Sequence, residues 1–235
     1  MRTCDVVVTT GGASVGRADF AKRALEGASR SVVRFGRLHM KPGKPTTFAT
    51  LDSRSFLDDV AGEKRWAFAL PGNPVSALTT ASLLVVPCLK RLQGVARSSC
   101  GPAELPVTLA APVSLDAVRP EFHRVALSLK GGDGNAEPYR VRHSGDIVAA
   151  STGVQRSSRL LSMRGAHVLA CLPERGRANL VAPGATAALP AGTTVPGLLI
   201  AAAPPLVAGA PFLAAAAGTP PPPAAAAPPP PPIDG

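Results

Sequence analysis

Aromatic residues are scarce in this sequence, at 4% of 235 residues, and their scarcity argues against a nucleic-acid-binding surface. The formal net charge of +10 favours an anionic partner, but binding of single-stranded nucleic acid needs aromatic rings interleaved with the basic side chains. The 25 lysines and arginines are also spread along the chain rather than gathered in one tract. We therefore expect phosphates or oxyanions as partners, and no nucleic acid.

Cysteine is rarer still, and its spacing excludes the common metal motifs. The four cysteines show neither a CxxC motif nor a Cys/His ligand spacing: Cys4, Cys88, Cys100 and Cys171. This pattern favours the reduced thiols of a cytoplasmic protein over a disulfide framework or a zinc site. The first residues lead directly into a predicted strand and do not resemble a signal peptide.

A long uninterrupted hydrophobic run is lacking as well. The apolar stretch over residues 195–218 contains Pro196, Pro204, Pro205 and Pro211. Because prolines at this density prevent a continuous helix, we expect no membrane span.

What the chain does contain divides into three regions. Residues 1–99 alternate short β-branched runs with amphipathic patterns, which predicts an α/β domain with a mostly parallel sheet. Residues 103–200 hold short strand-like runs separated by turn residues, which predicts a small all-β, barrel-like domain. Residues 201–235 are almost wholly alanine, proline and glycine, which predicts a disordered tail.

Individual elements follow from the same patterns. A helix is expected from Phe20, and a longer one has Asn73 at its N-cap, Pro74 in its first position, a kink near Pro87 and its end at Gly94. Residues 157–163 read as helical. Strands are expected at 6–9, 32–39, 47–51, 66–70, 105–110, 122–129, 139–142, 167–172 and 194–200, with a hairpin at the GGDGN turn.

Three stretches beside the predicted strands are dense in glycine, proline and polar residues: TTGGASVGRAD (9–19), MKPGKPTTFA (40–49) and LPGNPVSA (70–77). In the first, N–H groups of a glycine turn and a helix start can converge on a phosphate, although such turns are common in α/β folds. In the second, Lys41 and Lys44 on a proline-stiffened loop can converge on one anion, or form a solvated pair. In the third, Ser76 lies in the first helical turn, where it suits an oxyanion or merely caps the helix.

Together and in this order, the three stretches resemble the molybdopterin molybdotransferase family, which includes bacterial MoeA and the C-terminal domain of gephyrin. The resemblance continues through VPCLKRLQG, RPEFHR and STGVQRSSRLLSMRGA and covers about residues 4–175. Family members use adenylated molybdopterin and molybdate as substrates, with magnesium (Mg2+) as the usual metal. They release AMP and leave molybdenum on the dithiolene. The resemblance implies this reaction of molybdenum cofactor biosynthesis here, and a homodimer for full-length members.

The resemblance also implies site residues. Gly11, Gly12 and Ser14 would hold the phosphate of molybdopterin. Asp19 would bind the metal or orient the attacking water, with an N-cap as its alternative role. The residues that match the molybdate pocket offer cations and hydroxyls to a tetrahedral dianion: Lys41, Lys44, Pro45, Ser76, Arg119 and Ser157. For Arg119 the alternative is an ordinary surface arginine.

Departures from the family leave a second function open. Members carry two further N-terminal domains and the first half of the α/β domain, so we expect a partial chain whose three-layer molybdopterin-binding domain is incomplete, with an unpaired sheet edge. Val154 and Arg156 replace the usual His and Met in STGVQRSS. The retained lysines, Asp19 and Ser76 favour the enzyme. The incomplete sheet favours a non-catalytic fragment or a gephyrin-like scaffold.

Overall fold

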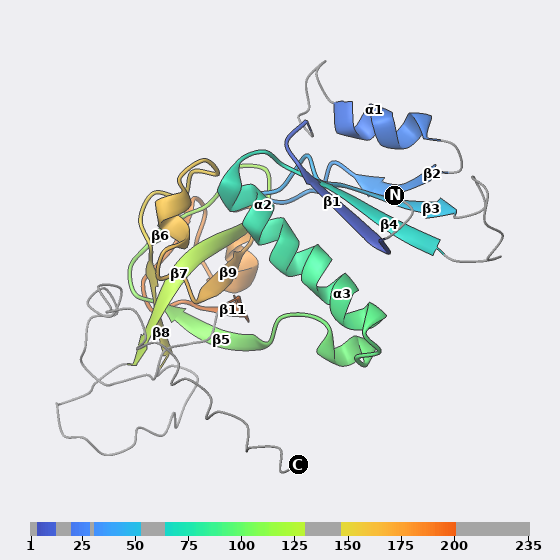
Figure 1. Ribbon diagram of the computed structural model, residues 1–235. Helices are drawn as coiled ribbons and strands as arrows, with labels where there is room; N and C mark the ends of the chain where they lie inside the picture. The colour runs from blue at the N-terminus through green and yellow to red at the C-terminus, as the bar shows by residue number, and fades with distance from the viewer. Residues whose placement is uncertain (1–3, 13–19, 29–30, 53–63, 130–146, 201–235) are drawn as a thin grey trace, which may run out of the picture.

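The computed structural model describes residues 4–12, 20–28, 31–52, 64–129 and 147–200. In these residues an α/β unit is followed by a β-barrel, as the sequence predicts, and the two lie side by side (Figure 1). The predicted strand at 139–142, the GGDGN turn and the tail from residue 201 lie outside the described residues.

The α/β unit contains a four-stranded sheet in the order β1-β4-β3-β2. Only β1 and β4 pair in parallel, whereas β4–β3 and β3–β2 are antiparallel, so the expectation of a mostly parallel sheet is wrong. Antiparallel neighbours need no crossover helix, and the connection between β2 and β3, residues 37–46, contains none. The bounds are β1 Val6–Thr10, α1 Phe20–Gly27, β2 Ser31–Gly36, β3 Thr47–Asp52 and β4 Lys64–Leu70.

The long helix begins at Pro74 and ends at Leu92, followed by Gly94 with a φ of 87°. It has three parts: α2 Pro74–Thr80, a π-helical turn η2 Ala81–Val85, and α3 Val86–Leu92. Pro87 has no N–H to donate and its ring would collide with the carbonyl of the preceding turn. The wider π turn, with the Val86 N–H bonded to the Ala81 carbonyl, lies directly before this proline.

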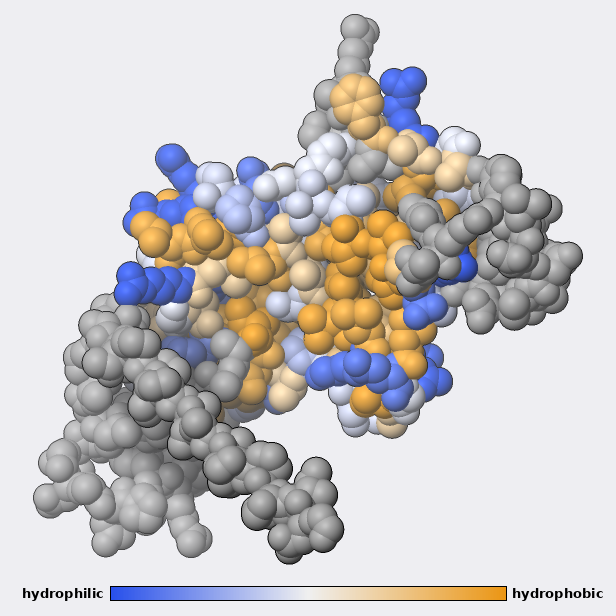
Figure 2. Space-filling view, viewed as in Figure 1, coloured by the Kyte–Doolittle hydropathy of each residue, from blue (hydrophilic) through white to orange (hydrophobic). Residues whose placement is uncertain are grey.

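This helix covers one side of the sheet and α1 lies on the other (Figure 1). Its inner face contributes Val85 to a cluster with Phe68 and Leu70 of β4. The outer face exposes Leu78, Val86, Leu89 and Leu92, and apolar side chains gather there in Figure 2. By length and composition Pro74–Leu92 would also pass as a membrane span, but core helices of soluble proteins pass the same test. We therefore do not assign this helix as a membrane span.

The second unit is a closed barrel in the order β11-β5-β8-β7-β9. Alternate residues of its strands, such as Val107 and Leu109 or Val125 and Leu127, are buried inside, which is the pattern of a small barrel. The predicted helix at 157–163 is a short 3-10 turn, η5 Leu160–Met163. The bounds are β5 Glu104–Leu109, β7 Glu121–Leu129, β8 Ile147–Ser151, β9 Val168–Leu172 and β11 Thr194–Leu199. The smaller elements are η3 Arg97–Ser99, β6 Val113–Ser114, η6 Arg175–Arg177, α4 Ala178–Val181 and β10 Ala188–Leu189.

Backbone hydrogen bonds join the two units. The Lys41 N–H donates to the Pro120 carbonyl at 2.9 Å, and the Phe122 N–H donates to the Lys41 carbonyl at 2.7 Å. The Val75 N–H, in the first turn of α2, donates to the Ser157 carbonyl at 3.1 Å. These bonds hold the loop before β3 and the start of α2 against the barrel.

Candidate functional site

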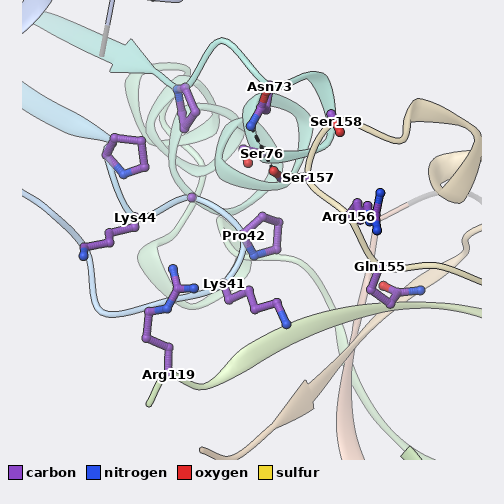
Figure 3. A pocket seen from close by; sticks show the side chains of 13 residues that line it. Lys41, Pro42, Lys44, Asn73, Ser76, Arg119, Gln155, Arg156, Ser157 and Ser158 are labelled. Carbon is purple, nitrogen blue, oxygen red and sulfur yellow. Dashed lines mark hydrogen bonds between the residues drawn. The ribbon is translucent and has the colours of Figure 1, made fainter. Parts of the chain in front are cut away.

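A cavity of about 600 Å3 lies at this junction (Figure 3). Its walls come from the loop between β2 and β3, the start of α2, the segment before β7 and the segment after β8. No acidic side chain among the described residues lines it. It brings together all the residues predicted for molybdate: Lys41, Lys44, Pro45, Ser76, Arg119 and Ser157.

The loop that carries the lysines is packed tightly against α2. Gly43 has a φ of 118°, and a Cβ there would lie 2.5 Å from a methyl carbon of Thr80. Thr46 closes the loop, because its N–H and its hydroxyl both donate to the Gly43 carbonyl, at 3.0 and 2.8 Å. The lysines are therefore on a fixed backbone, as the prolines in the sequence predict.

The two lysine side chains nevertheless diverge. Figure 3 shows Lys41 and Lys44 pointing to opposite sides of the loop instead of converging on one point. The Lys41 ammonium lies 2.9 Å from Glu121 Oε2 and 3.4 Å from Asp116 Oδ2, two carboxylates of the barrel. Burial tends to lower the pKa of Lys41, but these carboxylates outweigh burial and raise it. Lys41 is thus held charged and drawn toward the barrel, which the sequence spacing does not reveal.

Arg119 belongs to the same cluster of charges. Its Nη1 donates to the Met40 carbonyl at 3.3 Å, and its Nη2 lies 3.7 Å from Asp116 Oδ2. The Asp116 carboxylate also accepts the N–H groups of Val118 and Arg119. Burial tends to raise the pKa of Asp116, whereas these N–H groups and Lys41 lower it. These contacts therefore hold Arg119 in the cavity wall, so it is not a free surface arginine.

Asn73 does not cap α2 with its side chain, although the sequence predicts an N-cap there. The backbone of Asn73 is extended, as at an N-cap, but its side-chain amide donates to Ser157 Oγ at 2.9 Å. With its oxygen accepting that bond, the Ser157 hydroxyl can still donate its proton to an anion in the cavity. Sequence reasoning finds Ser157 and misses this contact, because the two residues are 84 positions apart.

The segment after β8 adds further lining residues: Gln155, Arg156 and Ser158. Arg156 departs from the family pattern and adds a guanidinium to the cavity wall. The segment is anchored by the fully buried Arg124, whose Nη2 donates to the Arg156 carbonyl and to Ser162 Oγ. Arg124 appears in the RPEFHR motif, but only the structure shows that it supports this wall.

The glycine turn after β1 lies apart from the lining of this cavity. Gly11 and Gly12 have φ of 84° and 69°, and a Cβ at Gly72 would lie 3.2 Å from the Gly11 Cα, so the turn after β1 contacts the turn after β4. The Gly11 N–H donates to the Leu70 carbonyl at 3.2 Å. It is therefore engaged within the sheet edge, contrary to its predicted role as a free phosphate donor. Ser14 and Asp19 lie outside the described residues.

The predicted metal site rests on Asp19, which lies outside the described residues. Within residues 4–12, 20–28, 31–52, 64–129 and 147–200, no group of three or more His, Cys, Asp or Glu side chains could hold a metal ion. Glu121 and Asp116 already bind Lys41.

Known proteins are similar to this chain in sequence and in fold. Residues 1–91 match a family described as a probable molybdopterin binding domain. The chain is 37% identical over 180 residues to gephyrin of Dictyostelium discoideum, covering 73% of this chain and 23% of gephyrin. It is 39% identical over 171 residues to the molybdenum cofactor synthesis protein cinnamon of Drosophila melanogaster, covering 73% of this chain and 24% of that protein.

A bacterial relative and a solved structure extend the comparison. The chain is 46% identical over 90 residues to a molybdopterin molybdenumtransferase of Haemophilus influenzae, covering 38% of this chain and 19% of the enzyme. The crystal structure of a molybdopterin biosynthesis MoeA protein from Pyrococcus horikoshii superposes with a TM-score of 0.55 at 25% identity, covering 85% of this chain and 38% of that one. The chain thus spans about a quarter of the length of the two longer relatives.

Proposed function

Because the chain belongs to the MoeA and gephyrin family, we propose that it takes part in molybdenum cofactor biosynthesis as the molybdate-holding part of a molybdopterin molybdotransferase. The observation that carries this proposal is the cavity at the junction of the two units. Its lining combines lysine, arginine and serine side chains from four separate segments around a volume of about 600 Å3. A tetrahedral dianion is the ligand class that this combination suits.

Each of four lining residues would contribute a different interaction to anion binding. Lys44 supplies a point charge, and no acidic side chain among the described residues forms an ion pair with it. Arg119 supplies a planar guanidinium, and Ser157 supplies a hydroxyl whose oxygen is already fixed by Asn73. Lys41 would share its charge between the anion and the two carboxylates. Contacts position Lys41, Arg119 and Ser157 before the anion arrives, which lowers the cost of ordering them. Lys44 is exposed and points to the other side of the loop, so its side chain would turn toward the anion.

The complete reaction needs more than this cavity. Hydrolysis of the adenylate would require the pterin phosphate near Gly12 and Ser14, with Asp19 orienting water or binding the metal. A divalent metal, when bound, would stabilise the negative charge that develops on the phosphate oxygens. The described residues of this chain would hold molybdate at the junction and keep it oriented toward the dithiolene.

Calorimetric titration of the purified chain with sodium molybdate at neutral pH tests the anion site. Removing one charged donor that contacts an anion is expected to cost about 1.5–3 kcal/mol, so Lys44→Ala and Arg119→Ala should each raise the Kd about 10-fold or more. Arg97→Ala removes the same charge from an exposed turn outside the cavity and should leave the Kd within about 2-fold. Equal affinities for all four proteins would refute the proposal.

A second measurement separates binding from catalysis. With adenylated molybdopterin, magnesium and molybdate, release of AMP that is lost in Asp19→Ala would support the full reaction. No release, together with intact molybdate binding, would favour the non-catalytic alternative.

That alternative has an observation in its favour. The outer face of the helix exposes Leu78, Val86, Leu89 and Leu92, and β1 pairs on one side only among the described strands. Such a surface suits association with another polypeptide, including a second copy of the chain. Sedimentation analysis of the purified chain would reveal the expected dimer by its mass.

A further inference from the structure

A second, smaller cavity of about 270 Å3 lies on the barrel beside the first. It shares Lys41 and Gln155 with the larger cavity and adds residues of the barrel strands: Glu121, His123 and Ser151. Its volume is just below the range of about 300–1,000 Å3 that is usual for small-molecule pockets, so it suits only a small substrate.

Three of its residues form a continuous hydrogen-bonded series. Ser151 Oγ lies 2.9 Å from His123 Nε2, and His123 Nδ1 lies 3.0 Å from Glu121 Oε1. The side chains of His123 and Glu121 are 8% and 3% exposed, whereas Ser151 is exposed. A nucleophile open to a cavity, a base within hydrogen-bond reach and a buried group that orients the base are the parts of an activated serine.

The direction of the proton in this series follows from the charge of Glu121. Burial tends to raise the pKa of Glu121, but hydrogen bonds from His123 and Lys41 outweigh burial and lower it. Glu121 is therefore a carboxylate at neutral pH and can only accept, so His123 Nδ1 carries a hydrogen. In the neutral ring Nε2 is then an acceptor. The Ser151 hydroxyl lies 2.9 Å from Nε2 and 3.3 Å from the Gly153 carbonyl, and it donates to the nearer of the two, Nε2. This tautomer is the one that a general base needs.

We propose that Ser151, His123 and Glu121 form a nucleophilic serine centre that hydrolyses small carboxylic esters, an activity separate from molybdate binding. Ser151 Oγ attacks the ester carbonyl carbon and gives its proton to His123 Nε2. The bond from that carbon to the leaving alkoxy oxygen breaks, and Nε2 returns the proton to the departing alcohol. Water then attacks the acyl-serine with its proton passing to Nε2 and on to Ser151 Oγ, so ester and water become acid and alcohol.

One neighbouring donor suits the oxyanion of such a reaction. The Gly153 N–H lies 3.4 Å from Ser151 Oγ, beside the point where a tetrahedral intermediate would form. The Gln155 side-chain amide, also 3.4 Å from Ser151 Oγ, already donates to the Arg124 and Gly153 carbonyls at 3.2 and 3.0 Å. The buried Glu121 is shared with Lys41 through its second oxygen, at 2.9 Å. Lys41 therefore fixes the carboxylate without displacing His123.

Labelling of the full chain with a fluorophosphonate tests this proposal. We expect one adduct, mapped to Ser151 by peptide mass spectrometry, and loss of general-base assistance in His123→Gln should slow labelling about 100-fold or more. Ser114 lines the same cavity, so Ser114→Ala is the matched control and should be labelled at the rate of the unaltered chain. Labelling at another serine, or an unchanged rate in His123→Gln, would overturn the proposal.

Hydrolysis of p-nitrophenyl acetate provides a second test, which does not depend on whether His123→Gln folds. Ser151→Ala removes one exposed oxygen and should leave the circular dichroism spectrum and molybdate affinity unchanged. We expect it to abolish the turnover seen with the unaltered chain. Turnover that persists in Ser151→Ala would refute a serine nucleophile, while molybdate titration reports separately on the larger cavity.

Discussion

Arg124 is a cation buried without a carboxylate in hydrogen-bond contact. It is 0% exposed, in β7, and its guanidinium reaches Ser162 Oγ at 3.2 and 3.3 Å and the Arg156 carbonyl at 3.4 Å. Its Nη1 has no hydrogen-bond partner among the described residues, and burial lowers the pKa of Arg124 despite the nearby negative charge of Glu121. Because its bonds are long and one partner is missing, the hydrogen bonds of the guanidinium do no more than offset its desolvation cost.

The net effect of replacing this arginine depends on the volume of the substitute. Arg124→Met loses the three bonds, which together contribute about 2–4 kcal/mol, and regains a desolvation cost of similar size. The Ser162 hydroxyl still donates to the Arg159 carbonyl at 2.7 Å, so the substitution does not leave it unpaired. We therefore expect Arg124→Met to change the free energy of unfolding by no more than about 1 kcal/mol. Arg124→Ala leaves a cavity as well and should cost about 3–5 kcal/mol.

Urea unfolding monitored by circular dichroism measures both variants against the unaltered chain. A loss of more than about 3 kcal/mol in Arg124→Met would refute the reasoning, because the guanidinium bonds would then exceed the desolvation cost. Molybdate titration of Arg124→Met adds a second expectation. Without the bond to the Arg156 carbonyl, the cavity wall is less ordered and affinity should fall about 2–10-fold even though stability is kept.

The remaining predictions concern acid stability, a glycine and a thiol. The pKa of Glu121 is lowered from its ordinary value of 4.5, so its stabilising contribution is present above pH 4.5 and is lost as pH falls through the folded-state pKa. Acid titration of unfolding should show that loss, and Glu121→Gln should remove it. Gly43→Ala forces a φ of 118° on a residue with a Cβ 2.5 Å from a threonine methyl, and we expect a cost of about 2–4 kcal/mol by urea unfolding. Gly94→Ala, at a φ of 87° with open space around it, should cost only about 1 kcal/mol. Burial raises the pKa of Cys171 to about 11, so iodoacetamide at pH 8 should modify exposed Cys4 at least about 10-fold faster, and equal rates by mass spectrometry would contradict that placement.

Several features of the fold follow from local sequence alone. Pro74 marks the first helical position and Gly94 follows the end of the helix, because proline suits the first turn and glycine the left-handed residue beyond the last one. Four strands of the barrel, β5, β7, β9 and β11, are found as alternating or β-branched runs, because the barrel interior is apolar. The fifth barrel strand, β8 Ile147–Ser151, is not among the predicted strands. The short strands Val113–Ser114 and Ala188–Leu189 are missed, since two residues carry no periodicity.

Part of the residue set that lines the smaller cavity could also be predicted from the sequence. Glu121 and His123 are two residues apart on one strand, and such residues point to the same face. The sequence motif RPEFHR therefore places an acid beside a histidine. Ser151 completes the series from β8, because antiparallel pairing opposes Val125 to Ser151. Only that register brings the hydroxyl to Nε2.

The sequence by itself determined which loops carry the anion-binding side chains, because Gly, Pro, Lys and Ser in these motifs have consequences that are local to the backbone. The tertiary structure alone decided where those side chains point. Lys41 turns away from Lys44 because Asp116 and Glu121 of the barrel attract its ammonium. Likewise, the Asn73 side chain donates to Ser157 Oγ instead of capping its own helix, because the packing of the two units brings Ser157 within reach. In both cases a hydrogen-bond or ion-pair partner that is tens of positions away in the sequence competes with groups nearby in the chain. How close that partner lies depends on the packing of the two units, and not on spacing along the chain.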